Sequence, residues 1–189
     1  SNVVVDSIIA DLKRAEILLT NIDPLNFEFP KTEDGNSGTG KDGFLEYRHK
    51  RMNLYAVKAM LARVYLYAGN KTEAVNYANQ VIDGKYFDLI GDATDVLRSK
   101  EIVFSVYVDK FDQQVTDITN GTSYLIVKES FLNEMFDVAN DGTNDLRIRE
   151  GVGFDYGTNG IKMRKYKQEN LWASTEGTVV LIRLSEMYY

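Results

Sequence analysis

The fold of this chain is decided by residues 51–84, which read RMNLYAVKAMLARVYLYAGNKTEAVNYANQVIDG. In the first half, apolar residues recur every three or four positions, as they do on one face of a helix. These residues are Leu54, Val57, Leu61, Ala62, Tyr65 and Leu66. Gly69 indicates the end of this helix, because glycine readily adopts the left-handed backbone found there. Thr72 is placed to cap a second helix, so the stretch predicts helices at 51–69 and 71–83.

Small side chains allow these two helices to approach closely. Alanine occurs in both of them, at Ala59, Ala62, Ala74 and Ala78. We therefore expect an antiparallel pair over residues 51–83, with Ala62 and Ala78 buried near its seam. The pair spans about 34 residues, which is the period of a tetratricopeptide repeat, and its alanines and tyrosines are placed as in that motif.

Two further segments indicate helices of the same kind. Residues 3–20 have apolar side chains at helical spacing, and Pro24 follows shortly after them. Residues 182–189 read IRLSEMYY and look like the start of a further repeat helix. Repeat pairs gain stability by stacking on neighbours, so one complete pair implies others beside it. The sequence predicts a mainly α chain that forms a single, partial domain over residues 1–189.

Residues 100–180 have a different character, and we expect a smaller irregular region with short strands there. Residues 101–108 are rich in β-branched and aromatic side chains, which predicts a strand. Residues 124–127 and 161–166 are two shorter strand candidates. Residues 130–138 have the apolar spacing of a short helix.

Composition excludes several classes of function. The net charge is −6 and the isoelectric point is about 4.9, so the chain lacks the basic surface that binds nucleic acid. The absence of cysteine excludes disulfides, thiolate metal sites and a cysteine nucleophile. No apolar run approaches the roughly 20 residues that a membrane-spanning helix needs.

Two stretches resemble phosphate- or ion-binding loops without completing them. Residues 35–41 fit the first seven places of a phosphate loop, but Asp42 stands where Ser or Thr is needed. Residues 137–148 resemble a calcium loop, but two ligand positions hold alanine and isoleucine. We expect a flexible loop and an acidic turn instead, and we predict no metal and no cofactor. A weak ion site stays open at Asp141, Asn144 and Asp145.

The sequence also predicts no catalytic residues. His49 is the only histidine and lies in the polar run 47–51, which we expect to be a solvated helix entry. Paired carboxylates suffice for glycoside hydrolysis, so a glycan-cleaving enzyme is one alternative. Glu129 and Glu134 instead fit the solvent face of the short helix at 130–138.

Several segments, taken in order, resemble proteins of the SusD/RagB-like family. Residues 50–70 match its first repeat helix and turn, and residues 74–86 match the second helix. Residues 101–104 match the following strand, residues 145–147 a signature tripeptide, and residues 182–188 the next repeat helix. Leu146 departs from the family's Asp-Pro-Arg signature at the proline. The matching arginines, Arg51, Arg63 and Arg183, are in positions that indicate structural roles.

The resemblance implies a SusD-like fold in which tetratricopeptide-like helical pairs form the scaffold and residues 100–180 form the ligand side. It implies a non-catalytic lipoprotein exposed on the outer membrane of a Bacteroidetes-type bacterium. Such proteins bind oligosaccharides, or other nutrients, for delivery to a TonB-dependent, SusC-like transporter. Their N-terminal lipid anchor is not in this sequence. A tetratricopeptide scaffold that binds other proteins is the main alternative.

Aromatic and polar residues are interleaved between Phe154 and Trp172, a composition typical of ligand sites. Glycines in the first half of this stretch predict an irregular binding loop. Trp172 and Tyr156 are the predicted sugar-binding aromatics, and Asn170 is a predicted hydrogen-bonding partner. Tyr166 is the aromatic most expected to belong to the core. Packing of Trp172 against the domain is the competing interpretation.

Overall fold

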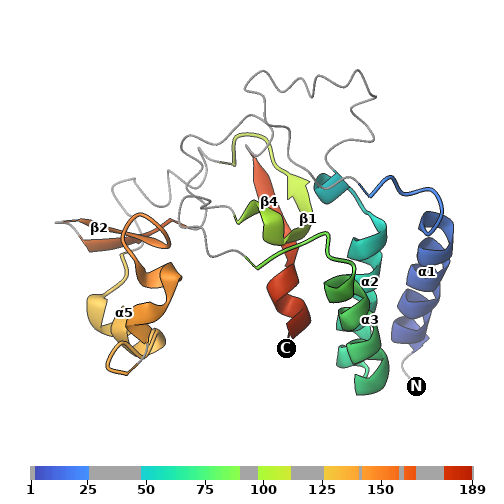
Figure 1. The fold of residues 1–189 in the computed structure, drawn as a ribbon, viewed down its shortest axis with the longest axis horizontal. Coiled ribbons are helices and arrows are strands. Elements are labelled where there is room, and N and C mark those ends of the chain that lie inside the picture. The colour runs from blue at the N-terminus through green and yellow to red at the C-terminus, as the bar shows by residue number, and fades with distance from the viewer. Residues whose placement is uncertain are drawn as a thin grey trace. The chain divides into compact units, whose positions relative to one another are not determined.

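The computed structural model divides the chain into two compact units (Figure 1). The residues that it describes are 3–25, 48–89, 98–111, 126–140, 142–157, 160–164 and 177–188. Unit 1 consists of Ser1–Leu89, Lys100–Tyr107 and Trp172–Tyr189, and unit 2 consists of Ile90–Ser99 and Val108–Leu171. Helices predominate over short strands, so the chain is mainly α as predicted. Within the described ranges, no helix is long and apolar enough to cross a membrane.

The helices of unit 1 are those predicted from apolar spacing, namely α1 (Val3–Leu19), α2 (Leu54–Tyr67) and α3 (Lys71–Asp83). The cap of α3 differs from the prediction of Thr72. Asn70 is the capping residue, and its side chain accepts a hydrogen bond from the backbone nitrogen of Glu73 at 3.2 Å. Asparagine is as good a cap as threonine or better, so the helix begins at the earlier residue.

Helices α2 and α3 pack against each other as an antiparallel pair (Figure 1). Tyr55 at the start of α2 lies beside Tyr86, which follows the end of α3, with ring centroids 5.0 Å apart. Ala62 is buried and Ala78 is partly buried against the same core. Small residues therefore occupy the seam between the two helices, where they allow close approach.

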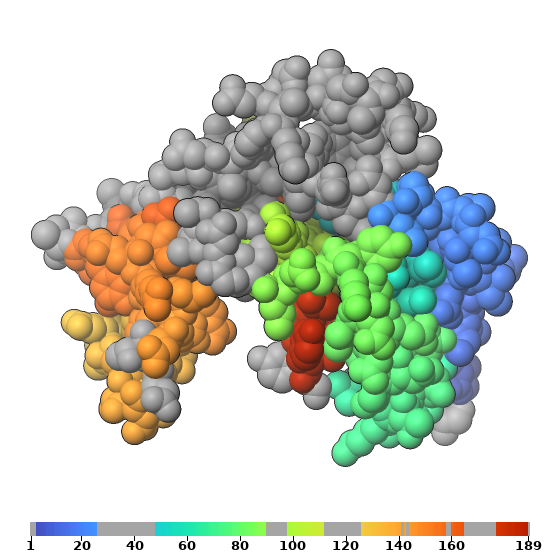
Figure 2. All heavy atoms as spheres, viewed as in Figure 1, coloured from blue at the N-terminus to red at the C-terminus, as the bar shows by residue number. Residues whose placement is uncertain are grey.

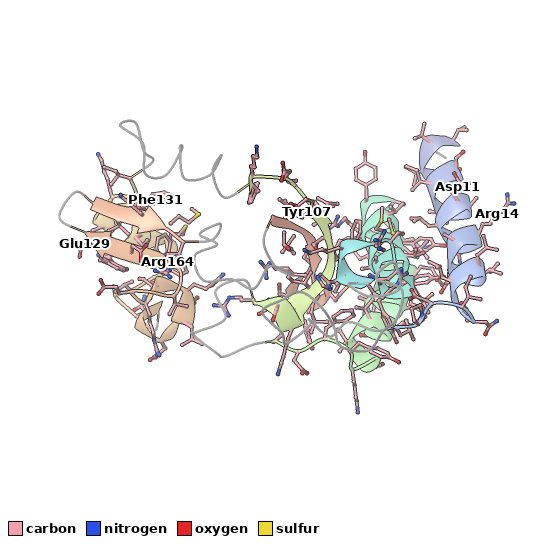
Figure 3. All side chains as sticks on the ribbon, turned by 90° about the horizontal axis from the view of Figure 1, so that it is seen from above. Asp11, Arg14, Tyr107, Glu129, Phe131 and Arg164 are labelled. Carbon is pink, nitrogen blue, oxygen red and sulfur yellow. The ribbon has the colours of Figure 1, made fainter. Side chains whose placement is uncertain are left out.

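Helix α1 covers this pair with one apolar face, made of Ile9, Leu12, Ala15 and Leu19. Lys13 adds a polar contact, since its Nζ donates a hydrogen bond to the Tyr77 hydroxyl at 3.0 Å. The ring of Tyr77 in turn stacks on Tyr65 of α2, with centroids 5.8 Å apart. Figure 3 shows Asp11 and Arg14 on the outer side of α1, away from α2. The helix is thus fixed by one face and exposes the other.

A two-stranded antiparallel sheet in unit 1 joins distant parts of the sequence. Strand β1 (Ile102–Tyr107) pairs with β4 (Thr178–Arg183), and Tyr107 lies opposite Thr178. Strand β1 confirms the strand predicted at 101–108. Its Ile102 and Val103 are buried, and so is Ile182 of β4, so the sheet contributes to the same core as the helices.

The helix predicted over residues 182–189 is wrong in both its start and its type. Ile182 and Arg183 continue β4, and Leu184–Tyr188 forms a short 3-10 helix. The run Thr178–Ile182 is rich in β-branched residues, and its ladder with β1 favours a strand at this point. The resemblance to a repeat helix in this segment was therefore misleading.

Polar groups are buried where α2 begins, although we predicted a solvated run at 47–51. Arg48 is buried, and His49 is 0% exposed. The Nε of Arg48 donates to Asp23 Oδ1 at 2.9 Å, and Asp23 Oδ2 accepts from the backbone nitrogen of Leu54 at 2.6 Å. A charged group tolerates burial when it is paired and hydrogen-bonded in this way. The prediction failed because it judged these residues by polarity and could not see their partners.

The buried residue Asn53 ties this segment to both α2 and the sheet. Its side-chain oxygen accepts from the backbone nitrogen of Ala56 at 2.7 Å, which caps α2. Its side-chain nitrogen donates to the carbonyl of Val103 in β1 at 2.9 Å. Ser105 of β1 donates from Oγ to the carbonyl of His49 at 3.0 Å. These bonds fix the entry of α2 against β1.

The described part of unit 2 contains a short helix and a β-hairpin. Helix α5 (Glu129–Met135) confirms the helix predicted at 130–138. Strands β2 (Phe154–Gly157) and β3 (Gly160–Met163) pair antiparallel. The buried core of the described part of this unit is small, and consists of Leu132, Phe154 and Ile161. Figure 2 shows the atoms of α5 and the hairpin as one packed mass in yellow and orange.

The two shorter strand candidates are realised only in part. The candidate at 161–166 corresponds to β3, which ends at Met163. In the candidate at 124–127, Val127 forms a single bridge to Ile161, and its backbone nitrogen donates to the Ile161 carbonyl at 2.8 Å. Residues 124, 125, 165 and 166 lie outside the described ranges.

Candidate functional site

Of the three predicted ligand-binding residues, the structure describes Tyr156. Asn170 and Trp172 lie outside the described residues, and Tyr166 does as well. The phosphate-loop-like stretch at 35–42 is also outside them. The candidate site is therefore built around Tyr156 and the side chains that the fold brings to it.

The glycine-rich stretch around β2 forms an ordered hairpin, so the predicted irregular loop was wrong for this part. Phe154 is 5% exposed and belongs to the core. A Cβ added to Gly153 would lie 1.9 Å from the carbonyl oxygen of Arg147, which no side chain could tolerate. Glycine there allows the 3-10 turn at Leu146–Ile148 to approach β2 closely. Its role is backbone packing rather than mobility.

Tyr156 lies at the edge of this small core. It is opposite Ile161 on β3 and on the same face of the hairpin as Phe154, because alternate residues of a strand share a face. Its side chain is 38% exposed, and its hydroxyl donates to the carbonyl of Ile148 at 2.8 Å. The hydroxyl is thus held in place while part of the residue stays open to solvent. Such a ring is pre-organised to receive an apolar ligand face.

Negative charges contribute to the electrostatics of this residue. The pKa of the Tyr156 phenol is raised above its ordinary value, first by burial and then by the negative charges of Glu129 and Glu150. Glu129 opens α5, and Glu150 forms a backbone bridge with Phe154. Both side chains are exposed, and Figure 3 shows Glu129 at the outer edge of unit 2.

Sequence reasoning did not identify these charges. Glu129 was expected only to support the solvent face of its helix, and Glu150 was not singled out. Backbone pairing joins the segments of these two residues to the hairpin: Val127 bonds to Ile161 two residues before Glu129, and Glu150 is bridged to Phe154. No local pattern signals such proximity, because it arises from tertiary contacts.

The opposite face of the hairpin carries charged side chains, and these lie next to side chains of opposite charge. Asp155 and Lys162 are direct cross-strand partners. Arg164 donates from Nη1 to Asp155 Oδ1 at 2.6 Å. Of the residues described on this face, none is aromatic. The face with Tyr156 is therefore the better candidate for binding a small polar ligand.

His49 and Asp145, two residues that the sequence analysis considered, are each constrained by their surroundings. Burial lowers the pKa of His49 to about 3, with a further contribution from the charge of Lys50, so the ring stays neutral and inaccessible. Asp145 accepts hydrogen bonds from Arg147, which lower the pKa of its carboxyl. In the part of the chain that is described, no three His, Asp or Glu side chains gather as metal ligands. Asp141 of the acidic turn lies outside that part.

No protein-family model matches the chain, and no curated protein or solved structure matches it either. The resemblance to the SusD/RagB-like family accordingly stays a hypothesis that rests on the quoted segments.

Proposed function

We propose that this chain is a non-catalytic binding protein for oligosaccharides, or for comparable nutrients. The observation that supports this most is Tyr156, a partly exposed residue whose hydroxyl is held by a hydrogen bond. A sugar presents C–H groups on its ring faces and hydroxyls around its edge. An aromatic ring matches the first feature, and polar groups in the same unit can match the second.

Trp172 and Asn170 extend the proposed site along the chain. The indole of Trp172 supplies a second stacking surface, and the amide of Asn170 supplies both a donor and an acceptor for sugar hydroxyls. Each aromatic side chain has few rotatable bonds to order when it binds a sugar.

The scaffold of the proposed protein is SusD-like. We assign α2 and α3 to a tetratricopeptide-like repeat, on the strength of their antiparallel packing and the alanines near their seam. Under this proposal the chain belongs to the SusD/RagB-like family and lies on the surface of a bacterial outer membrane. It is anchored there by an N-terminal lipid outside this sequence, and it passes its ligand to a TonB-dependent, SusC-like transporter.

The proposal includes binding without cleavage. His49 is neutral and buried, and so is unsuited to act as a general base on an external substrate. Glu129 and Glu150 are both exposed. Incubation with plant, host and microbial glycans should yield no new reducing ends. Steady product formation that one carboxylate substitution abolishes would favour the glycoside hydrolase instead.

A glycan array tests the proposed function directly. The wild-type chain should bind a defined subset of oligosaccharides. Tyr156→Ala and Trp172→Ala should each weaken that binding by roughly 1 kcal/mol or more, because each removes a stacking surface. Tyr67→Ala is the matched control, since Tyr67 is an 80% exposed tyrosine on α2 in unit 1. No glycan binding, or equal losses from the control, would contradict the proposal.

A protein-binding scaffold is the second candidate, and it is favoured by the outer surface of α1. Val4, Leu18 and Ile17 are large apolar residues exposed on this helix. Tetratricopeptide helices use such surfaces to stack on other helices or to bind peptides. An array without any glycan signal, together with capture of a helical peptide that Leu18→Asp abolishes, would favour this candidate.

A further inference from the structure

The hydrogen bonds of the hairpin fix the direction in which the backbone groups of Tyr156 point. Arg164 donates from its backbone nitrogen to the carbonyl of Gly153 at 2.8 Å, which makes these two residues a hydrogen-bonded pair. Hydrogen-bonded and non-hydrogen-bonded pairs alternate along an antiparallel ladder, so Tyr156 and Ile161 form a non-hydrogen-bonded pair. The backbone N–H and C=O of Tyr156 therefore point away from β3, at the outer edge of β2.

Bonds to neighbouring residues agree with this direction and leave the Tyr156 groups open. The Ile161 carbonyl, on the outer edge of β3, accepts from the Val127 amide at 2.8 Å. The Phe154 carbonyl, on the outer edge of β2, accepts from the Gly151 amide at 2.9 Å. Within the described ranges, the backbone N–H and C=O of Tyr156 form no hydrogen bond. This position of the edge thus offers one donor and one acceptor to a ligand.

The side chain of Tyr156 leans toward the same edge. Its hydroxyl donates to the carbonyl of Ile148 at 2.8 Å. The backbone bridge between Glu150 and Phe154 places the segment that follows Ile148 beside the outer edge of β2. The partly exposed ring and the open backbone groups therefore meet at one edge of the hairpin, as an apolar surface with a donor and an acceptor next to it.

We propose that this edge recognises a vicinal diol, which is a pair of hydroxyls on adjacent carbons of a sugar ring. One hydroxyl accepts from the Tyr156 N–H, its neighbour donates to the Tyr156 C=O, and the C–H face of the sugar packs on the aromatic ring. A strand residue presents its N–H and C=O in the same direction, as two adjacent equatorial hydroxyls present their oxygens. The inference rests on the proposed function, since it names the chemical group that the Tyr156 site binds.

An added peptide strand fits this edge less well than a diol does. Strand addition uses the N–H and C=O groups of alternate residues along an edge. The Phe154 carbonyl is already bonded to Gly151, so among the described residues of β2 Tyr156 is the one position at which both outward groups are open. A diol needs one such position, whereas a strand needs several in a row.

The sugar analogue 1,5-anhydroglucitol and two of its deoxy forms isolate the diol. Each deoxy form lacks one hydroxyl, but the 4-deoxy form keeps an adjacent pair on the ring and the 3-deoxy form keeps none. We expect the 4-deoxy form to bind within about twofold of the parent, and the 3-deoxy form roughly fivefold more weakly, because it loses one of two hydrogen bonds. In nuclear magnetic resonance titrations of the isotope-labelled chain, the parent and the 4-deoxy form should shift the amide signal of Tyr156.

Two variants that both lack the aromatic ring separate the backbone from the side chain. Tyr156→Ala keeps the N–H, so the three probes should all bind more weakly while the preference for the 4-deoxy form over the 3-deoxy form persists. Tyr156→Pro removes the N–H as well, and it should bind the two deoxy forms equally. Proline is tolerated on an edge strand where its nitrogen faces away from the partner strand. Exchange protection of the Val127 amide, which bonds to Ile161, checks that the hairpin is intact.

The outcomes distinguish this inference from the function on which it rests. Equal binding of the two deoxy forms by the wild-type chain, or a Tyr156 amide that the parent does not shift, would overturn diol recognition alone. A preference that Tyr156→Pro retains with its hairpin intact would overturn it equally. If proline disrupts the hairpin, the wild-type comparison decides. A glycan array with no Tyr156-dependent binding defeats the proposed function itself.

Discussion

The two units differ in where they put their polar groups. Unit 1 buries Asp23, Arg48 and Asn53 with their hydrogen-bond partners, next to a large apolar core. The described part of unit 2 buries Leu132, Phe154 and Ile161, and places its ion pairs at the surface. The first arrangement specifies one rigid packing, and the second leaves side chains open to solvent. The two units thus use the same residue types in two different ways.

The largest effect should come from breaking the buried ion pair of unit 1. Asp23→Ala leaves the Arg48 guanidinium buried without its carboxylate and removes the acceptor for the Leu54 amide. We expect a loss of about 3–5 kcal/mol in the free energy of unfolding. Hydrogen exchange should show it at the Val57 amide of α2, with less effect on the Val127 amide of unit 2. A loss under 1 kcal/mol would mean that the pair contributes little.

The next effect should come from the small core of unit 2. Leu132→Ala opens a cavity beside Phe154 and Ile161, where few neighbours can close it. We expect a loss of roughly 2–5 kcal/mol, concentrated in unit 2. Faster exchange of the Val127 amide should accompany weaker glycan binding, while the far-ultraviolet signal of α1, α2 and α3 persists. Uniform loss of protection in both units would show that they unfold together.

A pH titration should sharpen the comparison between the two units, since protonation of the buried residue His49 destabilises unit 1. The pKa of His49 is lowered to about 3 in the folded chain, against about 6.5 when it is unfolded. The unfolded chain therefore binds the proton first, and stability from this residue falls as pH drops from about 6.5 towards about 3. At about pH 5 the loss is roughly 2 kcal/mol. His49→Gln should flatten this slope in urea unfolding, and an unchanged slope would assign it to other groups.

The smallest effect should come from the Tyr156 hydroxyl. Tyr156→Phe keeps the ring but removes its hydrogen bond to the Ile148 carbonyl. Because the residue is partly exposed, we expect a loss of about 0.5–1 kcal/mol in the stability of unit 2. Glycan affinity should fall by less than it does in Tyr156→Ala. Equal losses in the two variants would mean that the hydroxyl, rather than the ring, binds the ligand.

The helices were predictable because their signals are local. Apolar spacing, Gly69 and the alanines of α2 and α3 all lie within one short stretch. The buried state of His49 and the strand at Ile182 were not predictable, because each depends on a partner far away in sequence. Asp23 pairs with Arg48 beside the histidine, and β1 pairs with β4. Resemblance to a repeat helix favoured the wrong element at the second of these places.

The sequence could name residues of the kind expected at the candidate site, but it could not give their positions in the fold. Interleaved aromatic and polar residues identified Tyr156, and the fold leaves it partly exposed. Phe154, two residues earlier, has the same chemistry but is buried, since it lies over Leu132 instead of at the end of the hairpin. The charges of Glu129 and Glu150 were missed because their segments are joined to the hairpin only in the folded chain.

The pairing of Tyr107 with Thr178 has a consequence for how such a chain can evolve. Residues 108–177, which include most of unit 2, are the connection between the paired strands β1 and β4. The entropy lost in closing a loop grows only with the logarithm of its length, by roughly 0.6 kcal/mol for each doubling. Segments inside it can therefore lengthen, shorten or be exchanged at little cost to the ladder. Selection can therefore replace the segments between the two strands while the strand pair is retained.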